Sequence, residues 1–313
     1  MEKNLIVFLA VAEEGNLTSA ASRVGLTQPA LTKIIRRLER EYGTPFFQRT
    51  SRGMVLTRAG AKLQERARSI DLHYRQSREE IRSMVTGSVS RFSIGAGAAF
   101  HMEIAPDLTR HLSKEFPETK LRLDFNVAGL TLPRLVAGKV DLMLGALHDR
   151  PPEGIETAEI MNVEIVPYCW RHDPLARSDG IHPFDLANRR WVIYRRDAMI
   201  VSRLSTYLSD SCLAPPEIAM EVEALAASFR IVSGTDYLTA APLSLTKVAS
   251  QFDLVPLRLA SPIWSFPSGA WYRQSSREFP IMRRALDLLP ELASYASPGI
   301  PEGNDKAARK SFP

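Results

Sequence analysis

The sequence lacks the features that mark several large classes of protein. Its 313 residues include only two cysteines, Cys169 and Cys212, and no CxxC pair, which argues against a disulfide framework or a zinc site. The six histidines are scattered without metal-ligand spacing. No uninterrupted apolar stretch approaches the roughly 20 residues that span a membrane. Because Lys3, Glu13 and Glu14 interrupt the N-terminal apolar run, we expect no signal peptide and a reduced, soluble, cytoplasmic protein.

Signatures of common enzyme classes are also absent. The sequence contains no GxxxxGK[ST], HExxH or GxSxG motif. Gly95-Ala96-Gly97 follows an expected strand, as a dinucleotide site would. Phe100, however, occupies the third glycine position, where close approach of the pyrophosphate requires a small residue. We therefore expect no cofactor and no metal, and an oxidoreductase is the weaker alternative.

Positive charge is concentrated near the N-terminus. The segment Leu17–Arg58 holds two acidic residues, Glu39 and Glu41, and eight basic ones: Arg23, Lys33, Arg36, Arg37, Arg40, Arg49, Arg52 and Arg58. This local excess of six (8 − 2) is larger than the net charge of +5 for the whole chain. Such a local basic field suits a polyanion, although a solvated helix face would carry the same charge.

The same segment predicts a winged helix-turn-helix. A first amphipathic helix ends near Gly15, and Asn16 can cap the second helix. Gly25 permits the left-handed conformation of a turn, and Thr27 is a plausible N-cap for a third helix. Two short strands, 46–49 and 54–57, then flank the turn Ser51-Arg52-Gly53.

The third helix has one apolar and one polar face. Leu31, Ile34, Ile35 and Leu38 form the apolar stripe, which we expect to be buried. The polar face predicts contacts with DNA in the major groove, and the expected wing adds two arginines, Arg49 for the backbone and Arg52 for the minor groove. That face carries Gln28, Thr32, Lys33 and Arg36. Each residue alone would fit a helical bundle equally well, but their joint order favours DNA.

A long helix is expected from Arg58 to Val85. Apolar residues recur along it at steps of four and three, which predicts a seam that faces a partner helix. The seam comprises Leu63, Ala67, Ile70, Tyr74, Ser77, Ile81 and Met84. Packing of this helix on its own domain is the alternative.

From Arg91 onward, strands and helices alternate, which favours an α/β domain with parallel sheets and two linked lobes. The tail, residues 297–313, is rich in Pro, Gly and charge, so we expect it to be disordered. A solute-binding protein of a transport system would have the same α/β texture. Such a protein would need an export signal, and the basic N-terminal domain would serve no purpose in it.

Residues 1–60 closely resemble the N-terminal domain of LysR-type bacterial transcriptional regulators. The matching positions are Ala20-Ala21, Thr27-Gln28-Pro29-Ala30, Arg37-Leu38-Glu39, Gly43, Phe47, Arg49 and Leu56-Thr57-Arg58-Ala59-Gly60. The resemblance implies a multi-domain fold: an all-α winged helix-turn-helix plus linker helix, then a two-lobed α/β effector domain like type 2 periplasmic binding proteins. The implied divisions are a DNA-binding domain at 1–58, a dimerising linker helix at 59–88, an effector domain at 89–296 and the tail.

The resemblance also implies partners and DNA contacts. It implies a homodimer or homotetramer that binds double-stranded DNA with two-fold related half-sites, responds to a small metabolite and contacts RNA polymerase. The contacting positions would be Gln28, Pro29, Thr32, Lys33, Arg36 and Arg52.

Ligands of open α/β sheets bind beyond the carboxyl ends of the strands. This rule singles out the loops at 97–101, 128–131 and 147–150, and residues 195–201 across the cleft. Where many members of the family have a Ser or Thr hydroxyl, this chain has Ala98-Ala99-Phe100-His101, which favours a bulkier or more apolar effector. The candidate effector contacts are Ala99, Phe100, His101, Thr131, Leu147, Arg196 and Met199. Phe100 could instead fill the core, and His101 could lie at the surface.

Overall fold

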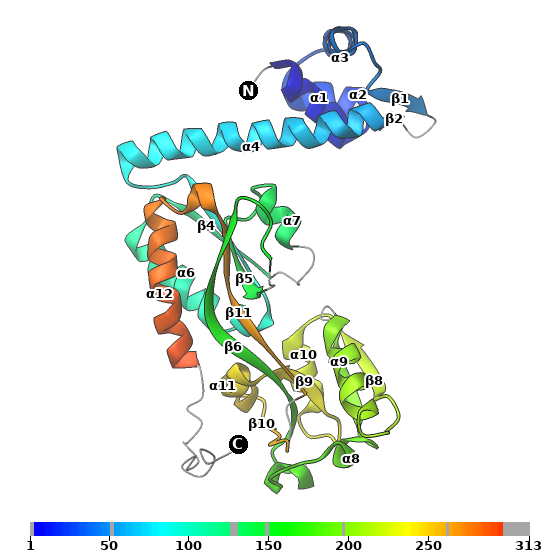
Figure 1. The fold of residues 1–313 in the computed structure, drawn as a ribbon, viewed down its shortest axis with the longest axis vertical. Helices are drawn as coiled ribbons and strands as arrows, with labels where there is room; N and C mark the ends of the chain where they lie inside the picture. The colour runs from blue at the N-terminus through cyan, green and yellow to red at the C-terminus, as the bar shows by residue number, and fades with distance from the viewer. Residues whose placement is uncertain are drawn as a thin grey trace, which may run out of the picture. The chain divides into compact units, whose positions relative to one another are not determined.

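A computed structural model describes residues 3–50, 53–125, 131–147, 150–195, 198–260 and 263–296. The chain divides into two compact units, Met1–Gly87 and Ser88–Pro313 (Figure 1). The predicted tail at 297–313 lies outside the described residues. Within the described ranges, no helix combines the length and apolarity needed to span a membrane, and no three His, Cys, Asp or Glu side chains gather as metal ligands.

The first unit has the predicted order of three helices, a hairpin and a long helix. Its elements are α1 (Lys3–Glu14), α2 (Leu17–Val24), α3 (Gln28–Tyr42), β1 (Phe47–Thr50), β2 (Gly53–Leu56) and α4 (Arg58–Thr86). The Asn16 side chain accepts a hydrogen bond from the Thr18 amide at 2.8 Å, and Gly25 has a φ of 66°. Both predictions for the turn are therefore confirmed. Thr27 stands at the N-cap position of α3, but its side chain makes no capping hydrogen bond.

Close backbone approaches hold the hairpin against the helices. The Glu39 carboxylate accepts a hydrogen bond from the Phe46 amide at 2.8 Å, which ties α3 to the start of β1. The Met54 amide donates to the Gly15 carbonyl at 2.8 Å, so β2 lies against the junction of α1 and α2. A Cβ on Gly60 would lie only 2.1 Å from the Phe46 carbonyl oxygen. Only glycine fits at the start of α4 without moving the hairpin.

The predicted seam on α4 has two parts. Ala67 is fully buried, and both Ala67 and Leu63 pack into the core of the first unit together with Phe8 and Leu31. Further along α4, apolar side chains are exposed: Ile70 and Tyr74 by 48%, Ile81 by 64% and Met84 by 85%. The prediction of one seam is therefore wrong for Leu63 and Ala67, because the core of the first unit itself covers them.

The second unit is built on a seven-stranded sheet of order β10-β6-β11-β5-β3-β4, with β9 also paired to β6. The strands are β3 (Arg91–Ala96), β4 (Lys120–Phe125), β5 (Leu142–Ala146), β6 (Ile155–Trp170), β9 (Thr239–Pro242), β10 (Leu254–Pro256) and β11 (Trp264–Arg273). Within the described part of this sheet, only β3, β4 and β5 pair in parallel. The expectation of parallel sheets is wrong for the rest, because the long strands β6 and β11 run antiparallel through both lobes (Figure 1).

Helices complete the two lobes. The first lobe has α5 (Ala98–His101), α6 (Ile104–Glu115), α7 (Thr131–Val136), η3 (Gln274–Ser276) and α12 (Pro280–Ala296). The second lobe has the parallel pair β7 (Arg190–Tyr194) and β8 (Glu217–Val222), and it also has η1 (Pro174–Arg177), α8 (Pro183–Leu186), α9 (Ala198–Ser209), α10 (Leu225–Val232), η2 (Leu243–Leu245) and α11 (Thr246–Ser250). α6 and α12 lie side by side on the first lobe (Figure 1).

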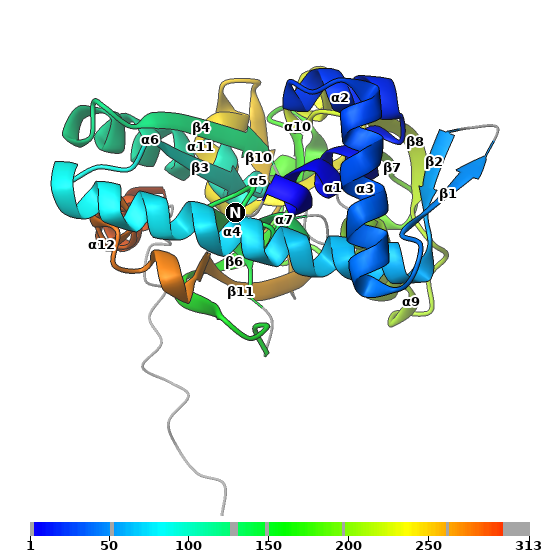
Figure 2. The ribbon, with the colours of Figure 1, turned by 90° about the horizontal axis from the view of Figure 1, so that it is seen from above.

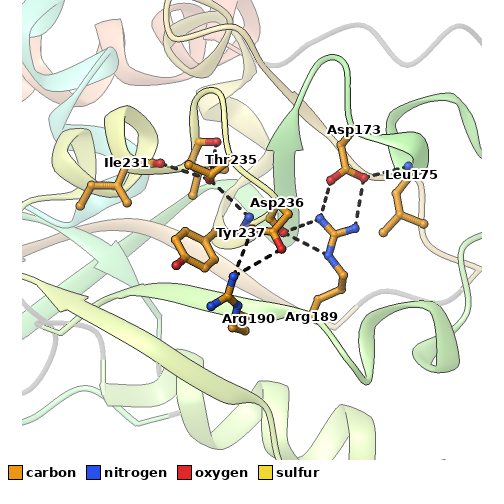
Figure 3. Close-up of polar contacts among 9 residues, drawn as sticks. Asp173, Leu175, Arg189, Arg190, Ile231, Thr235, Asp236 and Tyr237 are labelled. Carbon is orange, nitrogen blue, oxygen red and sulfur yellow. Dashed lines mark hydrogen bonds and ion pairs between the residues drawn. The ribbon is translucent and has the colours of Figure 1, made fainter.

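Buried ion pairs brace each lobe. In the first lobe, Arg273 donates to Asp141 and to the Val140 carbonyl, each at 2.7 Å. In the second lobe, the Arg189 guanidinium donates to both carboxylate oxygens of Asp173 and to the Asp236 carbonyl (Figure 3). The Asp173 side chain is only 3% exposed. Arg189 therefore joins two loops that are distant in the sequence.

Candidate nucleic-acid interface and ligand site

The outward face of α3 presents the predicted polar residues. Gln28, Pro29, Lys33 and Arg36 are exposed, and Thr32 is half-buried with its hydroxyl donating to the Gln28 carbonyl at 2.9 Å. The opposite face is anchored in the core, where Leu31 is 0%, Ile35 4% and Leu38 2% exposed. The 3.6-residue periodicity therefore separated the two faces of this helix as expected.

Charges on this face are not neutralised by the protein. Across the described part of the chain, Lys33, Arg36 and Arg37 form no ion pair with a carboxylate. Arg23 differs, because Glu13 and Glu14 pair with it at 2.7 and 3.0 Å. The basic excess counted from the sequence therefore includes one arginine, Arg23, whose charge is neutralised by two glutamates of the same unit.

A groove of about 1190 Å³ runs along α3 (Figure 2 looks onto this helix, with the β1–β2 hairpin beside it). It is lined by Gln28, Pro29, Thr32, Lys33, Arg36, Glu39, Arg40, Gly43, Thr44 and Pro45. Arg40 and Thr44 were not among the predicted contacts. The sequence carried a signal for Arg40, which follows Arg36 by four residues on the same helical face, but none for Thr44, which lies beyond the end of α3 at Tyr42.

The hairpin contributes Arg49, which is exposed on β1 opposite Met54. The Thr50 hydroxyl donates to the Gly53 carbonyl at 3.1 Å and so closes the hairpin. Arg52, predicted to enter the minor groove, lies outside the described residues.

In the second unit, the carboxyl ends of the parallel strands of both lobes meet. Phe125 ends β4 in register with Ala96 of β3, while Tyr194 ends β7 in register with Val222 of β8. The Phe125 and Tyr194 rings are in edge contact, with centroids 5.8 Å apart. This lobe junction is where ligands of open α/β sheets bind.

His101 lies at the same junction. Its ring centroid is 4.9 Å from that of Phe125, in a T-shaped arrangement. Burial lowers the pKa of His101 below its ordinary value of 6.5, so the imidazole is neutral near pH 7. A neutral imidazole donates or accepts a hydrogen bond but does not attract an anion as an imidazolium would.

The structure separates the predicted effector contacts. Phe100 is 1% exposed and Ala99 9%, and both belong to the main core cluster of the second unit, which includes side chains from both lobes. Leu147 is half-buried and its amide donates to the Pro267 carbonyl at 2.9 Å, whereas Met199 on α9 is 44% exposed. Thr131 begins α7. Arg196, like loop residues 126–130 and 148–149, lies outside the described residues.

Sequence reasoning missed Phe125 and Tyr194. Each is the last residue of its strand, and this position was the only available signal. Arg195, expected across from the first lobe, forms an ion pair with Glu223 at the exposed ends of β7 and β8.

Comparisons with known protein families match both units. Residues 3–61 match the bacterial regulatory helix-turn-helix protein family of lysR type, and residues 86–294 match the LysR substrate binding domain. The chain is 24% identical over 298 residues to the HTH-type transcriptional regulator TdcA of Escherichia coli K12, covering 94% of this chain and 93% of TdcA. It is 27% identical over 293 residues to ClcR of Pseudomonas putida, covering 92% and 97%.

A solved structure has the same fold. Full-length CbnR in complex with its target DNA aligns with a TM-score of 0.63 at 22% identity, covering 93% of this chain and 100% of that chain. Together the two family matches span most of the sequence. The chain therefore belongs to the LysR family: it is a DNA-binding transcriptional regulator with a helix-turn-helix domain followed by an effector-binding domain.

Proposed function

We propose that α3 reads base edges in the major groove through Gln28, Pro29, Thr32, Lys33 and Arg36, and that Arg49 and Arg52 of the wing contact the backbone and minor groove. The observation that carries this proposal is the exposed, unneutralised charge of Lys33 and Arg36 on a helix whose other face is anchored in the core. Phosphates release counterions when such charges bind them, which supplies affinity. Arg40 and Thr44 extend the same groove and join the proposed contacts.

The test compares Arg36→Ala with wild type on genomic fragments that the wild-type protein selects. We expect Arg36→Ala to weaken binding by about 1–3 kcal/mol, as for an arginine that contacts a base or a desolvated phosphate. Wild-type affinity should fall by roughly 0.9 log units per log unit of salt for each phosphate neutralised. Arg258→Ala, an exposed arginine in the effector domain, is the control. Equal affinity of Arg36→Ala and wild type would remove Arg36 from the interface, and a flat salt titration would contradict the electrostatic basis.

We further propose that α4 pairs two chains, so that a homodimer or a homotetramer binds two-fold related half-sites. The support is the run of exposed apolar side chains beyond Ala67, from Ile70 to Met84. Ile70→Lys would place a charge in that seam and should shift the protein to monomers in sedimentation. Glu79→Lys, a charge change at a polar position of the same helix, is the control. An intact oligomer for Ile70→Lys would refute pairing through this part of α4.

For the second unit, we propose that a small metabolite binds at the lobe junction and shifts the arrangement of the lobes. A ligand has this effect only when it binds one arrangement more tightly than the other. His101 and Met199 remain proposed contacts together with Thr131, Leu147 and Arg196, whereas Ala99 and Phe100 are assigned to packing. We propose that the regulator acts in the cytoplasm on RNA polymerase and catalyses no reaction.

A further inference from the structure

An open cavity lies in the second lobe, at the opposite end of β7 from the lobe junction. Tyr194 ends β7 at that junction, whereas Arg190 begins the strand beside Asp236 and Tyr237, which line the cavity. The cavity has a volume of about 490 Å³, within the range of sites that bind small molecules. All eight lining residues belong to the second lobe and to the described part of the chain. The cavity is therefore separate from the metabolite site proposed at the lobe junction.

Hydrogen bonds hold the two loops that form the walls of this cavity (Figure 3). The Thr235 hydroxyl accepts from the Tyr237 amide at 3.3 Å and donates to two carbonyls of α10, which fixes the turn after that helix. Arg189 donates to both carboxylate oxygens of Asp173 and to the Asp236 carbonyl, and so ties one loop to the other. Walls that are already ordered lose little conformational freedom when a ligand binds.

Aromatic rings form much of the wall. Trp170, His172 and Tyr237 line the cavity, and the His172 ring meets the Trp170 ring edge to face, with centroids 4.9 Å apart. The Tyr237 ring already holds one cation, because the guanidinium carbon of Arg190 lies 4.6 Å from its centroid. Faces of aromatic rings attract cations, and the indole ring does so most strongly. Trp170 is half-buried and supplies an indole ring to a ligand in the cavity.

The charged side chains of the wall favour a cation as well. Two carboxylates, Asp173 and Asp236, line the cavity, whereas no lysine or arginine is among the eight lining residues. Arg189 neutralises Asp173, whose side chain is 3% exposed. Asp236 is held less firmly, since its side chain is 72% exposed and its contacts with Arg190 are 3.4 and 3.5 Å long. Long, exposed ion pairs are weak, so Asp236 still attracts a second cation.

We propose that this cavity is a second ligand site of the effector domain and that it binds a small organic cation, an ammonium group that carries methyl or methylene groups. The charge lies between the Trp170 ring and the Asp236 carboxylate, and the apolar groups pack on the rest of the wall. An anion would meet two carboxylates without a lining cation. A neutral apolar molecule would leave the Asp236 carboxylate unused. Binding stabilises the second lobe by mass action, whether or not a metabolite occupies the lobe junction.

Choline and 3,3-dimethylbutan-1-ol test this selection, because they share one shape and differ in the charge of a single atom. Their affinities are measured by ligand-observed NMR titration with the full-length protein, at constant ionic strength. We expect wild type to bind choline in the millimolar range and roughly two- to thirty-fold more tightly than the alcohol, which is the range that a cation over an aromatic ring contributes. Absence of choline binding at millimolar concentration, or equal binding of the two compounds, would overturn the proposal.

Asp236→Asn tests the carboxylate, because it removes the charge and keeps the size of an exposed side chain. The preference for choline over the alcohol should fall by roughly three- to five-fold, as for the loss of one exposed charge interaction. Asp179→Asn makes the same change at a carboxylate that is 75% exposed and pairs with Arg258, outside the cavity. This control should keep the wild-type preference.

Trp170→Leu tests the ring, because it keeps an apolar side chain but removes the indole, and the preference for choline should largely disappear. Trp264→Leu is the control: Trp264 is also half-buried and carries the Arg203 guanidinium 5.1 Å from its ring, but it lies on β11 and does not line the cavity. Thermal unfolding checks that each variant is folded, and Asp236→Asn decides alone if Trp170→Leu is not. A folded variant at either Trp170 or Asp236 that retains the full preference overturns the site.

Discussion

The two units of this regulator use charge in opposite ways. In the DNA-binding domain, Lys33 and Arg36 are exposed and form no ion pair with the residues that the structure describes, and the core beneath them is apolar. In the effector domain, Arg189 and Arg273 are turned inward and paired with Asp173 and Asp141. The unpaired charges of the first domain produce a positive electrostatic field that attracts an external polyanion. The paired charges of the second domain fix loops in place.

The difference extends to how each unit is held together. The small DNA-binding domain depends on close backbone contacts, such as that of Gly60 with the Phe46 carbonyl. In the effector domain, the ion pair between Arg189 and Asp173 fixes loops, and the rings of Phe125 and Tyr194 are in contact at the junction between the lobes. Charge that attracts an external polyanion must remain unpaired, whereas charge that fixes loops is paired within the domain. Substitutions of one unit should therefore leave the other intact.

The largest effect is expected for Gly60→Ala. The added Cβ would lie 2.1 Å from the Phe46 carbonyl oxygen and 2.9 Å from the Leu56 side chain, and a backbone atom cannot move aside as a flexible side chain would. We expect a loss of about 4 kcal/mol or more from the stability of the DNA-binding domain, and with it DNA binding. Hydrogen exchange resolved by domain measures the loss.

The control for this prediction is Gly145→Ala, whose new Cβ meets no atom within 4 Å and which lies in the effector domain. Its exchange rates should match wild type in both domains. A folded DNA-binding domain in Gly60→Ala would contradict the tight contact. Faster exchange in the effector domain of Gly60→Ala would instead show that the units are not independent.

The second-largest loss of stability is expected for Asp173→Ala in the effector domain. Removal of this carboxylate leaves the Arg189 guanidinium, 18% exposed, without its bidentate partner in the second lobe (Figure 3). Breaking such a pair typically costs about 3–5 kcal/mol. We expect the lower end, since Arg189 keeps its hydrogen bonds to the Asp236 carbonyl. Thermal unfolding of the effector domain measures the loss, while DNA affinity should be unchanged.

Asp179→Ala is the matched control, because it breaks an ion pair with Arg258 whose side chains are 75% and 79% exposed. Exposed pairs contribute little, so this variant should unfold as wild type does. Equal destabilisation by Asp173→Ala and Asp179→Ala would contradict the role assigned to the buried pair.

Predictions from the sequence were most accurate where structure depends on neighbouring residues. The cap at Asn16, the turn at Gly25 and the two faces of α3 follow from residues within one or two helical turns. The seam on α4 was only partly predicted, because heptad spacing does not show which partner covers Leu63 and Ala67.

The lobe junction was harder to predict, because distant segments build it. Phe125 and Tyr194 meet only because β6 and β11 connect the lobes and bring the ends of β4 and β7 together. Local periodicity contains no information about that contact. For the same reason, the sequence placed Phe100 in a binding loop, although its side chain is buried in the main core of the effector domain.

The smallest effect concerns pH and the neutral imidazole at the lobe junction. Because burial lowers the pKa of His101, the unfolded chain binds a proton at a higher pH than the folded chain does. The contribution of His101 to the stability of the effector domain is therefore fully present above its unfolded pKa of about 6.5 and is lost as pH falls toward the lower folded value.

His101→Gln should reduce the loss of effector-domain stability between pH 7.5 and pH 5.5, measured by chemical unfolding. The other histidines contribute equally to both proteins, so the difference between the two pH profiles isolates this residue. His182→Gln, a substitution at an exposed position in the second lobe, controls for the general effect of removing a histidine. Identical pH profiles for wild type and His101→Gln would show that the junction does not disfavour the charged imidazole, and the contrast in charge between the junction and α3 would then weaken.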